Sequence, residues 1–295
     1  MNNMKIIALV TLYNPDSALV ERLSKLSPQV SEIVLLDNSP SSLSEKMLYE
    51  IKMLKTCVYH FFGKNLGLSA AFNWALKNLA EAKSSDFMIF FDQDSCVAEN
   101  LVQKLVDDFL RISKKAKIGC LGPVYFDSTV KKYSGITERS EIVEENVYEV
   151  SEIITSSMIT TYKILEGTGF WDESIFLDYA DFELCWRMKK FGYRTFITKD
   201  CALSHSLGTG FLEINFLFKK LTFNYSSPLR EYYQTRAAIK LLKRNYIPKN
   251  WRRNFIFNLT FRIWIFLAHL PKKRSRLRNF LCGLFDGIKN KSGEK

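Results

Sequence analysis

Short apolar runs alternate with amphipathic segments along the first half of the chain. Each apolar run has the length of a buried strand, and the runs cover residues 5–12, 32–36, 58–62, 87–91 and 118–122. Segments between them, such as 17–26 and 101–111, carry apolar residues at helical spacing. Strands that alternate with helices predict an α/β domain built on a parallel, doubly wound sheet.

The apolar run 87–91 stops at two carboxylates, Asp92 and Asp94, with Gln93 between them. A buried strand holds its end in a fixed place, and open α/β sheets bind ligands at the carboxyl ends of their strands. Two acids on a tight turn there can hold a hard divalent cation, with substrate phosphates as further ligands. The alternative is that both acids are turn residues whose side chains cap the local backbone.

Polar residues also follow the first three predicted strands. Tyr13 and Asn14 follow the first strand, Asp37 follows the second, and Asn65 and Gly67 follow the third. A glycine lets the backbone approach a ligand closely, and an acid at the end of a second strand commonly accepts hydrogen bonds from a base or ribose. These junctions are typical of a nucleotide-binding α/β unit, although Asp37 as a plain turn residue is an equally open interpretation.

Aromatic residues and acids are interleaved in a second informative stretch, residues 169–188. Aromatic rings stack on the apolar face of a sugar while carboxylates accept its hydroxyl hydrogens, so we expect Trp171, Asp178 and Tyr179 to contact a sugar or an acceptor. The stretch therefore predicts part of a sugar-binding cleft.

Helical spacing begins at residue 180 and places Asp181 in the first turn of a helix. The helix dipole is expected to keep this carboxylate ionised, and an ionised acid in a cleft can act as a general base toward an alcohol. The alternative is that Asp181 is simply an acid at a helix N-terminus.

The positive charge of the chain is concentrated at its end. The net charge is +11, and residues 243–295 hold 14 of the 42 Lys and Arg residues against two acids. The remaining body is close to neutral and lacks a basic stripe or a nucleic-acid reader motif, so we expect no nucleic-acid partner.

The apolar segment 254–270 lies within this basic end and is too short and polar for a clean membrane-spanning helix. Its basic flanks fit a helix that lies in the plane of an anionic membrane. Alternatively, the helix packs on the rest of the protein or forms an oligomer interface.

The six cysteines are scattered without a C-x-x-C pair, which is typical of reduced thiols in the cytoplasm. The N-terminus carries no small-residue cleavage site, so a secretory signal is not expected. We therefore expect a cytoplasmic active site, on a protein held peripherally at the inner face of the plasma membrane.

The combined motifs resemble the family 2 inverting glycosyltransferases with the GT-A fold, and among them the bacterial rhamnosyltransferases of O-antigen and capsule assembly. The resemblance covers about residues 4 to 240, and its most specific runs are F-F-D-Q-D-S and D-Y-x-D-F-E-L-C-W-R. It implies a Rossmann-like GT-A domain with a mostly parallel sheet over residues 1–242, and the charge distribution adds a helical basic extension over 243–295.

The resemblance also implies roles for individual residues. Tyr13 and Asp37 would contact the base and ribose of the donor, Asp92 the ribose or the metal, and Asp94 a Mg²⁺ or Mn²⁺ ion on the diphosphate. Asp181 takes the place of the catalytic base, although many relatives have Glu-Asp where this chain has Ala180 and Asp181.

His205 matches a histidine that reaches the metal or diphosphate in some relatives, and a structural role for it is equally open. Arg230 and Arg236 match an R-x-Y-Y-x-x-R segment assigned to the diphosphate or acceptor side. The further residues expected at the donor are Asn14, Asn65, Gly67 and Gln93.

The implied function is transfer of a sugar, with L-rhamnose from dTDP-rhamnose as the first choice, to a lipid-linked or growing polysaccharide acceptor. UDP-hexose or UDP-galactofuranose transfer and a non-catalytic carbohydrate-binding role are the alternatives. A nucleotidyltransferase should show a loop rich in glycine and lysine, and residues 11–20 contain none. The sequence leaves the oligomeric state open.

Overall fold

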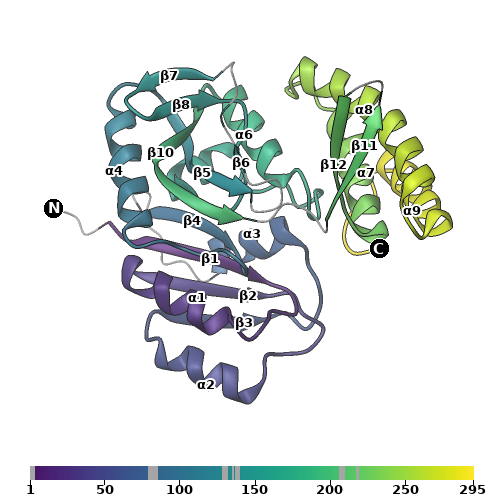
Figure 1. Cartoon of the computed structure of the whole chain (residues 1–295). Coiled ribbons are helices and arrows are strands. Elements are labelled where there is room, and N and C mark those ends of the chain that lie inside the picture. Colours follow the sequence, from purple (N-terminus) through teal and green to yellow (C-terminus); the bar gives the residue numbers. More distant parts are fainter. Residues whose placement is uncertain are drawn as a thin grey trace.

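The computed structural model describes residues 4–78, 86–127, 132–134, 136, 140–205, 210–216 and 219–295 (Figure 1). In this part of the chain one large sheet has the strand order β3-β2-β1-β4-β9-β5-β10-β8-β7, with β6 paired to β5. Its strands are β1 (Ile6–Leu12), β2 (Glu32–Asp37), β3 (Cys57–Phe61), β4 (Phe87–Asp92), β5 (Ile118–Asp127), β6 (Lys132–Ser134), β7 (Glu141–Glu144), β8 (Val147–Val150), β9 (Met158–Thr161) and β10 (Arg194–His205).

The first four strands, which the sequence predicted, pair with one another in parallel. β1 pairs in parallel with β2 and β4, β2 with β3, and β5 with β10. β9 is inserted antiparallel between β4 and β5, and the β7–β8 hairpin extends the edge at β10. The predicted mostly parallel sheet is therefore confirmed, with antiparallel additions that strand–helix alternation could not indicate.

Helices follow most of the parallel strands. They are α1 (Leu19–Leu26), α2 (Glu45–Met53), α3 (Leu68–Asn78), α4 (Leu101–Ser113), α5 (Tyr162–Thr168) and α6 (Ala180–Lys190). The predicted apolar face of α1 is buried through Leu19, Leu23 and Leu26. The apolar residues of β4 are all buried, as expected for a strand at the centre of a sheet.

The carboxyl ends of three strands meet at one edge of the sheet. In the parallel register, Leu12 of β1 lies beside Asp37 of β2, and Thr11 lies beside Asp92 of β4. The polar residues that follow these strands are therefore gathered at one place, although they are up to 80 positions apart in the chain.

The chain continues with a hairpin and three helices beside the sheet (Figure 1). The hairpin consists of β11 (Gly210–Phe216) and β12 (Lys219–Tyr225), and the helices are α7 (Pro228–Leu242), α8 (Lys249–His269) and α9 (Lys273–Ile288). Among the residues that the structure describes, no helix combines the length and apolar character needed to cross a membrane.

α9 packs directly against the backbone of α7. A Cβ atom at Gly283 would stand 2.6 Å from the carbonyl oxygen of Tyr232, and one at Gly287 would stand 2.7 Å from Cβ of Ile239. Two glycines four positions apart therefore let the helices approach closely. Packing on the rest of the protein, one of the alternatives left open for segment 254–270, is observed here for the following helix, α9.

Candidate active site

A cleft of about 520 Å³ lies at the carboxyl ends of β1 and β4. Seven residues that the sequence predicted for a donor or metal site line this cleft: Tyr13, Asn65, Gly67, Asp92, Gln93, Asp94 and Arg230. They come from four separate segments of the chain, so the fold assembles the cleft from the strand ends and the start of α7.

Gln93 joins the ends of the two central strands. Its side-chain oxygen accepts a hydrogen bond from the backbone N–H of Tyr13 at 2.7 Å, and its amide donates to the carbonyl of Tyr13 at 3.2 Å. The ring of Tyr13 is exposed at the cleft. The backbone of Tyr13 is thus held at two points, while its ring stays open to a ligand.

Asp92 and Asp94 sit at the base of the cleft on and just after β4. Ser156 donates a hydrogen bond to Oδ2 of Asp92 at 2.5 Å, whereas the side chain of Asp94 is exposed. Carboxylate oxygens are the ligands that Mg²⁺ and Mn²⁺ prefer, so this pair fits the implied cation chemically.

In the described part of the chain, no group of three or more His, Cys, Asp or Glu side chains stands together as a complete metal site. A cation held by Asp92 and Asp94 would take its further ligands from water or from oxygen atoms of a bound diphosphate. The side chain of His205, the third predicted ligand, lies outside what the structure describes.

Asp181 is in the first turn of α6, as the spacing predicted. Its Oδ1 accepts a hydrogen bond from the backbone N–H of Phe182 at 2.9 Å, and its Oδ2 accepts from the backbone N–H of Thr155 at 3.1 Å. The hydroxyl of Thr155 also donates to Oδ2, at 3.3 Å. These donors fix the direction of the carboxylate.

The pKa of Asp181 is raised from 3.8 to about 7, chiefly by burial and to a smaller extent by the negative charges of Asp92 and Asp178. The two backbone donors lower the pKa but do not offset the loss of water. We expected the helix dipole to keep the group ionised, and this expectation is corrected because desolvation is the larger effect. A pKa near neutrality is well matched to a general base.

One short segment connects two of the acids. Thr155 bonds Asp181, and the next residue, Ser156, bonds Asp92. Asp92 lines the cleft, whereas Asp181 is not among the lining residues. The two carboxylates are close enough for the charge of Asp92 to raise the pKa of Asp181.

Arg230 and Asp178 form a bidentate ion pair at the cleft. Nη2 of Arg230 lies 2.9 Å from Oδ1 of Asp178, and Nε lies 3.1 and 3.2 Å from the two carboxylate oxygens. Arg230 lies in the first turn of α7, and the side chain of Ser227 caps the helix by accepting a hydrogen bond from the backbone N–H of Arg230. Asp178, expected at the sugar or acceptor, therefore directs its carboxylate to the arginine.

Asp37 is buried completely and does not line the cleft. Its Oδ1 accepts from the backbone N–H of Ser39 at 2.9 Å, and its Oδ2 accepts from the hydroxyl of Tyr59 at 2.6 Å. The expected contact with the donor's ribose is corrected to the turn role, because both oxygens are engaged within the fold. The neighbouring Asn38 lines the cleft instead.

Trp171 is a core residue. Its ring centroid lies 5.0 Å from that of Phe90 and 5.1 Å from that of Phe72, and the side chain is buried. The expected stacking of Trp171 on a sugar is corrected, since neither face of the ring is open to a ligand. Tyr179, in the left-handed backbone region, packs edge-on against Trp251 of α8, with 5.6 Å between ring centroids.

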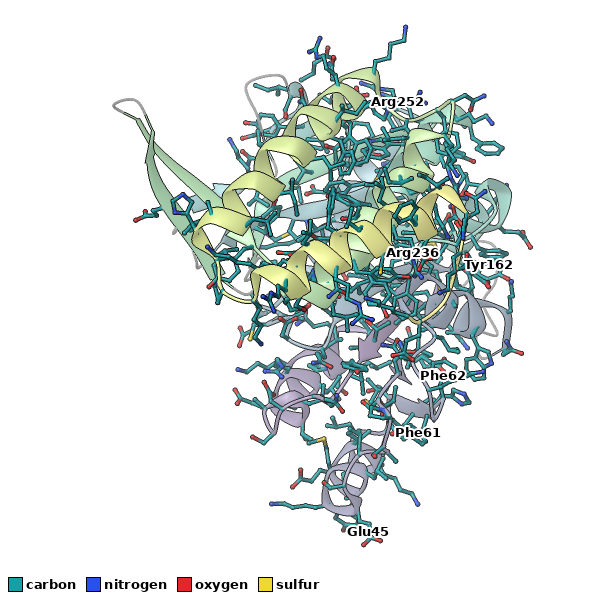
Figure 2. All side chains as sticks on the ribbon, turned by 90° about the vertical axis from the view of Figure 1, so that its right-hand side faces the viewer. Glu45, Phe61, Phe62, Tyr162, Arg236 and Arg252 are labelled. Carbon is teal, nitrogen blue, oxygen red and sulfur yellow. The ribbon has the colours of Figure 1, made fainter. Side chains whose placement is uncertain are left out.

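Arg236, a residue of α7, is also buried, and Figure 2 labels its position. It donates to the hydroxyl of Tyr232 at 3.1 Å and to the carbonyl of Gly293 at 2.6 Å. The expected diphosphate contact is corrected to a structural role that holds the C-terminal residues. Asn14, at the exposed turn after β1, donates its backbone N–H to Ser39 at 2.8 Å and does not line the cleft.

Several lining residues were not indicated by the sequence, above all Glu294. The backbone around it is held by the Arg236–Gly293 hydrogen bond and by the N–H of Lys295, which donates to the hydroxyl of Tyr233 at 3.0 Å. Tyr233 and Phe176 line the same wall, with their rings stacked at 4.6 Å between centroids. No sequence signal connects residue 294 to strand ends more than 200 positions away.

Known sequences resemble this chain over most of its length. Residues 8–166 match the family model described as Glycosyl transferase family 2. The chain is 28% identical over 303 residues to dTDP-rhamnosyl transferase RfbF of Shigella flexneri, a match that covers 99% of this chain and 98% of the relative. It is 22% identical over 205 residues to a poly-beta-1,6-N-acetyl-D-glucosamine synthase of Staphylococcus aureus (strain COL), covering 64% of this chain and 47% of the relative.

Two solved structures share the fold. A crystal structure of GalNAc-T7 with UDP, GalNAc and Mn²⁺ has a TM-score of 0.60 at 14% identity, covering 98% of this chain and 57% of that chain. A structure of S. aureus TarS 1-349 in complex with UDP has a TM-score of 0.56 at 16% identity, covering 98% of this chain and 81% of that chain. The fold is thereby shown to be the GT-A fold that the sequence predicted.

Proposed function

Because the chain belongs to glycosyl transferase family 2, we propose that this glycosyltransferase moves L-rhamnose from dTDP-rhamnose to a saccharide acceptor, with inversion at the anomeric carbon. The near full-length similarity to a dTDP-rhamnosyl transferase supports the choice of donor. The observation that supports the mechanism is the segment Thr155–Ser156, which bonds Asp181 on one side and Asp92, a lining residue of the cleft, on the other.

The cleft offers matched groups to a nucleoside diphosphate. The exposed ring of Tyr13 can stack on the base, and Gly67 lines the same cleft. Arg230 brings a positive charge to the wall where the diphosphate would lie. Asp92 and Asp94 would hold Mg²⁺ or Mn²⁺, which offsets negative charge on the departing nucleoside diphosphate when bound.

Asp181 acts as the general base in this proposal. As the acceptor oxygen bonds to the anomeric carbon, the bond from that carbon to the diphosphate oxygen breaks, and the acceptor proton passes to a carboxylate oxygen of Asp181. Thr155 and Phe182 keep the carboxylate in place for the transfer. A single displacement of this kind inverts the configuration.

We propose a lipid-linked or growing cell-surface saccharide as the acceptor, used at the inner face of the plasma membrane. The support is the strong positive charge of residues 243–295, which would attract an anionic membrane where such acceptors lie. A UDP-sugar is the second candidate donor, because two solved structures of the same fold contain UDP.

A donor panel tests the proposal. The protein is incubated with Mg²⁺ or Mn²⁺ and, in turn, dTDP-rhamnose, a UDP-hexose and UDP-galactofuranose, and the melting temperature is recorded. We expect dTDP-rhamnose to raise it most, because a ligand that binds only the folded state stabilises it. A larger rise in melting temperature with a UDP-sugar would show that this UDP-sugar is the preferred donor. No rise with any of the three nucleotide sugars would refute donor binding.

The variant Asp181→Asn tests the catalytic assignment. It keeps the size of the side chain and removes the base, so we expect it to abolish transfer while the melting-temperature rise with donor remains. Retained turnover would remove Asp181 from the role.

A further inference from the structure

One face of α9 is apolar and open to solvent. Leu277 and Leu281 are each 41% exposed, Phe285 is 58% exposed and Ile288 is 55% exposed. At 3.6 residues per turn their spacing places all four within an arc of about 80° around the helix. We call these four residues the α9 stripe.

The opposite face of α9 packs against α7 and thereby keeps the α9 stripe facing outward. Gly283 and Gly287 are pressed against the backbone of α7, and Arg276 is buried in an ion pair with Glu231 of α7. The hydroxyl of Tyr232 donates to Asp286 at 2.6 Å on the same interface. The helix therefore cannot rotate to bury the stripe without losing these contacts, and Figure 2 shows α9 on the outside of the molecule.

Cations border the stripe. The exposed basic side chains of α9 and its C-cap are Lys273, Arg274, Arg278 and Lys289. The one acid of the helix, Asp286, is engaged by Tyr232 and by Lys291. A row of large apolar side chains flanked by Lys and Arg is the pattern of a helix that lies in the interface of an anionic bilayer.

We propose that the α9 stripe inserts into the surface of an anionic lipid bilayer, with the bordering Lys and Arg residues on the lipid headgroups. This assignment refines the membrane attachment proposed above and does not depend on the identity of the donor. Charge favours lipid over a second copy of this chain, because a symmetric dimer through the stripe would bring the same cations face to face. The sequence placed the lipid contact at 254–270, and about half of the side chains of that segment lie outside what the structure describes, so the α9 stripe is a second, independent candidate.

Because α9 packs on α7, attachment of α9 to a bilayer would bring the cleft near a membrane-bound acceptor. α7 has α9 on one side and contributes Arg230 and Tyr233 to the cleft on another. Packed helices lie about 8–10 Å apart, so the two helices α9 and α7 would separate the bilayer surface from the cleft. A saccharide carried by a lipid would then reach the site while its lipid stays in the membrane.

The test is sedimentation of the full-length protein with vesicles. Vesicles of phosphatidylcholine alone are compared with vesicles of phosphatidylcholine and phosphatidylglycerol, using wild type, the double variant Leu281→Glu/Phe285→Glu, and the control Tyr49→Glu/Ile142→Glu. The control replaces exposed apolar residues far from α9, Tyr49 at 67% and Ile142 at 71% exposure. We expect wild type and control to bind the anionic vesicles and the stripe variant to bind at least about tenfold more weakly.

Further measurements separate the outcomes. An unchanged melting temperature and an unchanged melting-temperature rise with nucleotide sugar would show that the stripe variant is folded and that its donor cleft is intact. Arg274→Gln/Arg278→Gln should weaken binding to anionic vesicles while leaving folding unchanged, because each basic residue near the surface contributes to attraction. Equal binding of the stripe variant and the control would overturn the proposal, as would a wild-type dimer in light scattering that the stripe variant lacks.

Discussion

The raised pKa of Asp181 makes the stability of the protein depend on pH in a defined direction. This pKa is about 7 in the folded protein, against 3.8 for an ordinary aspartate. Between these two values the folded state holds a proton that the unfolded chain has released. The free energy of unfolding therefore falls as the pH rises through this window, by about 1.4 kcal/mol per unit and about 4 kcal/mol in all.

The variant Asp181→Asn isolates this contribution, because asparagine does not titrate. Thr155 and Phe182 both donate backbone hydrogen bonds to the carboxylate, and asparagine offers one acceptor oxygen where aspartate offers two. The variant therefore carries a fixed penalty of about 1–3 kcal/mol for an unpaired donor. This penalty does not change with pH, so the difference between the two proteins changes only through Asp181.

Urea unfolding of both proteins at a series of pH values from about 4 to 8 measures the effect. We expect the stability of wild type to fall relative to the variant as the pH rises, until the trend ends above about pH 7. A difference that stays constant across the series would refute the assigned pKa. A difference that changes in the opposite direction would mean that Asp181 is stabilised in its ionised form.

Three further results follow from the same structure. For catalysis, kcat/KM should rise tenfold per pH unit below about pH 7 and then level off, because the base must be ionised; a flat profile in a pH-rate experiment would contradict this. Asp94→Ala should abolish the dependence of donor binding on Mg²⁺ in calorimetric titration, whereas Asp107→Ala, which removes an exposed acid of α4, should leave it intact. Gly67→Ala should lower the melting temperature by several degrees, because Gly67 has a φ of +81° and a Cβ atom there would stand 2.4 Å from the carbonyl oxygen of Phe176. Gly167→Ala is its control, since a Cβ atom there meets nothing within 4 Å.

The strand ends and their polar residues could be predicted from the sequence. Buried parallel strands are near-continuous apolar runs, so the points where β1 and β4 stop are marked by the first polar residues after them. Parallel register then brings these points together, and Tyr13, Gln93 and Asp94 accordingly line the cleft. Local pattern was sufficient because each residue follows directly from the strand that carries it.

The environment of individual side chains could not be predicted in the same way. Asp37 and Asp92 both end strands of the sheet. Asp37 is buried and accepts hydrogen bonds from Tyr59 and Ser39, whereas Asp92 lines the cleft. Trp171 lies in a stretch with a sugar-binding composition, but its ring fills the core. Residue type and spacing are the same for a buried side chain and for one that contacts a ligand, so packing partners from distant segments decide between them.

The sequence by itself determined the parallel strands β1 to β4, the acids at their edge and the place of Asp181 in the first turn of α6, because these depend on apolar periodicity and on the first residues that interrupt it. Only the tertiary structure decided the pKa of Asp181, the presence of Glu294 at the cleft and the direction of the α9 stripe. Each of these depends on contacts between segments far apart in the chain: Thr155 with Asp181, Arg236 with Gly293, and α7 with the glycines of α9. Desolvation and close packing are properties of such contacts, and they exist only once the chain has folded.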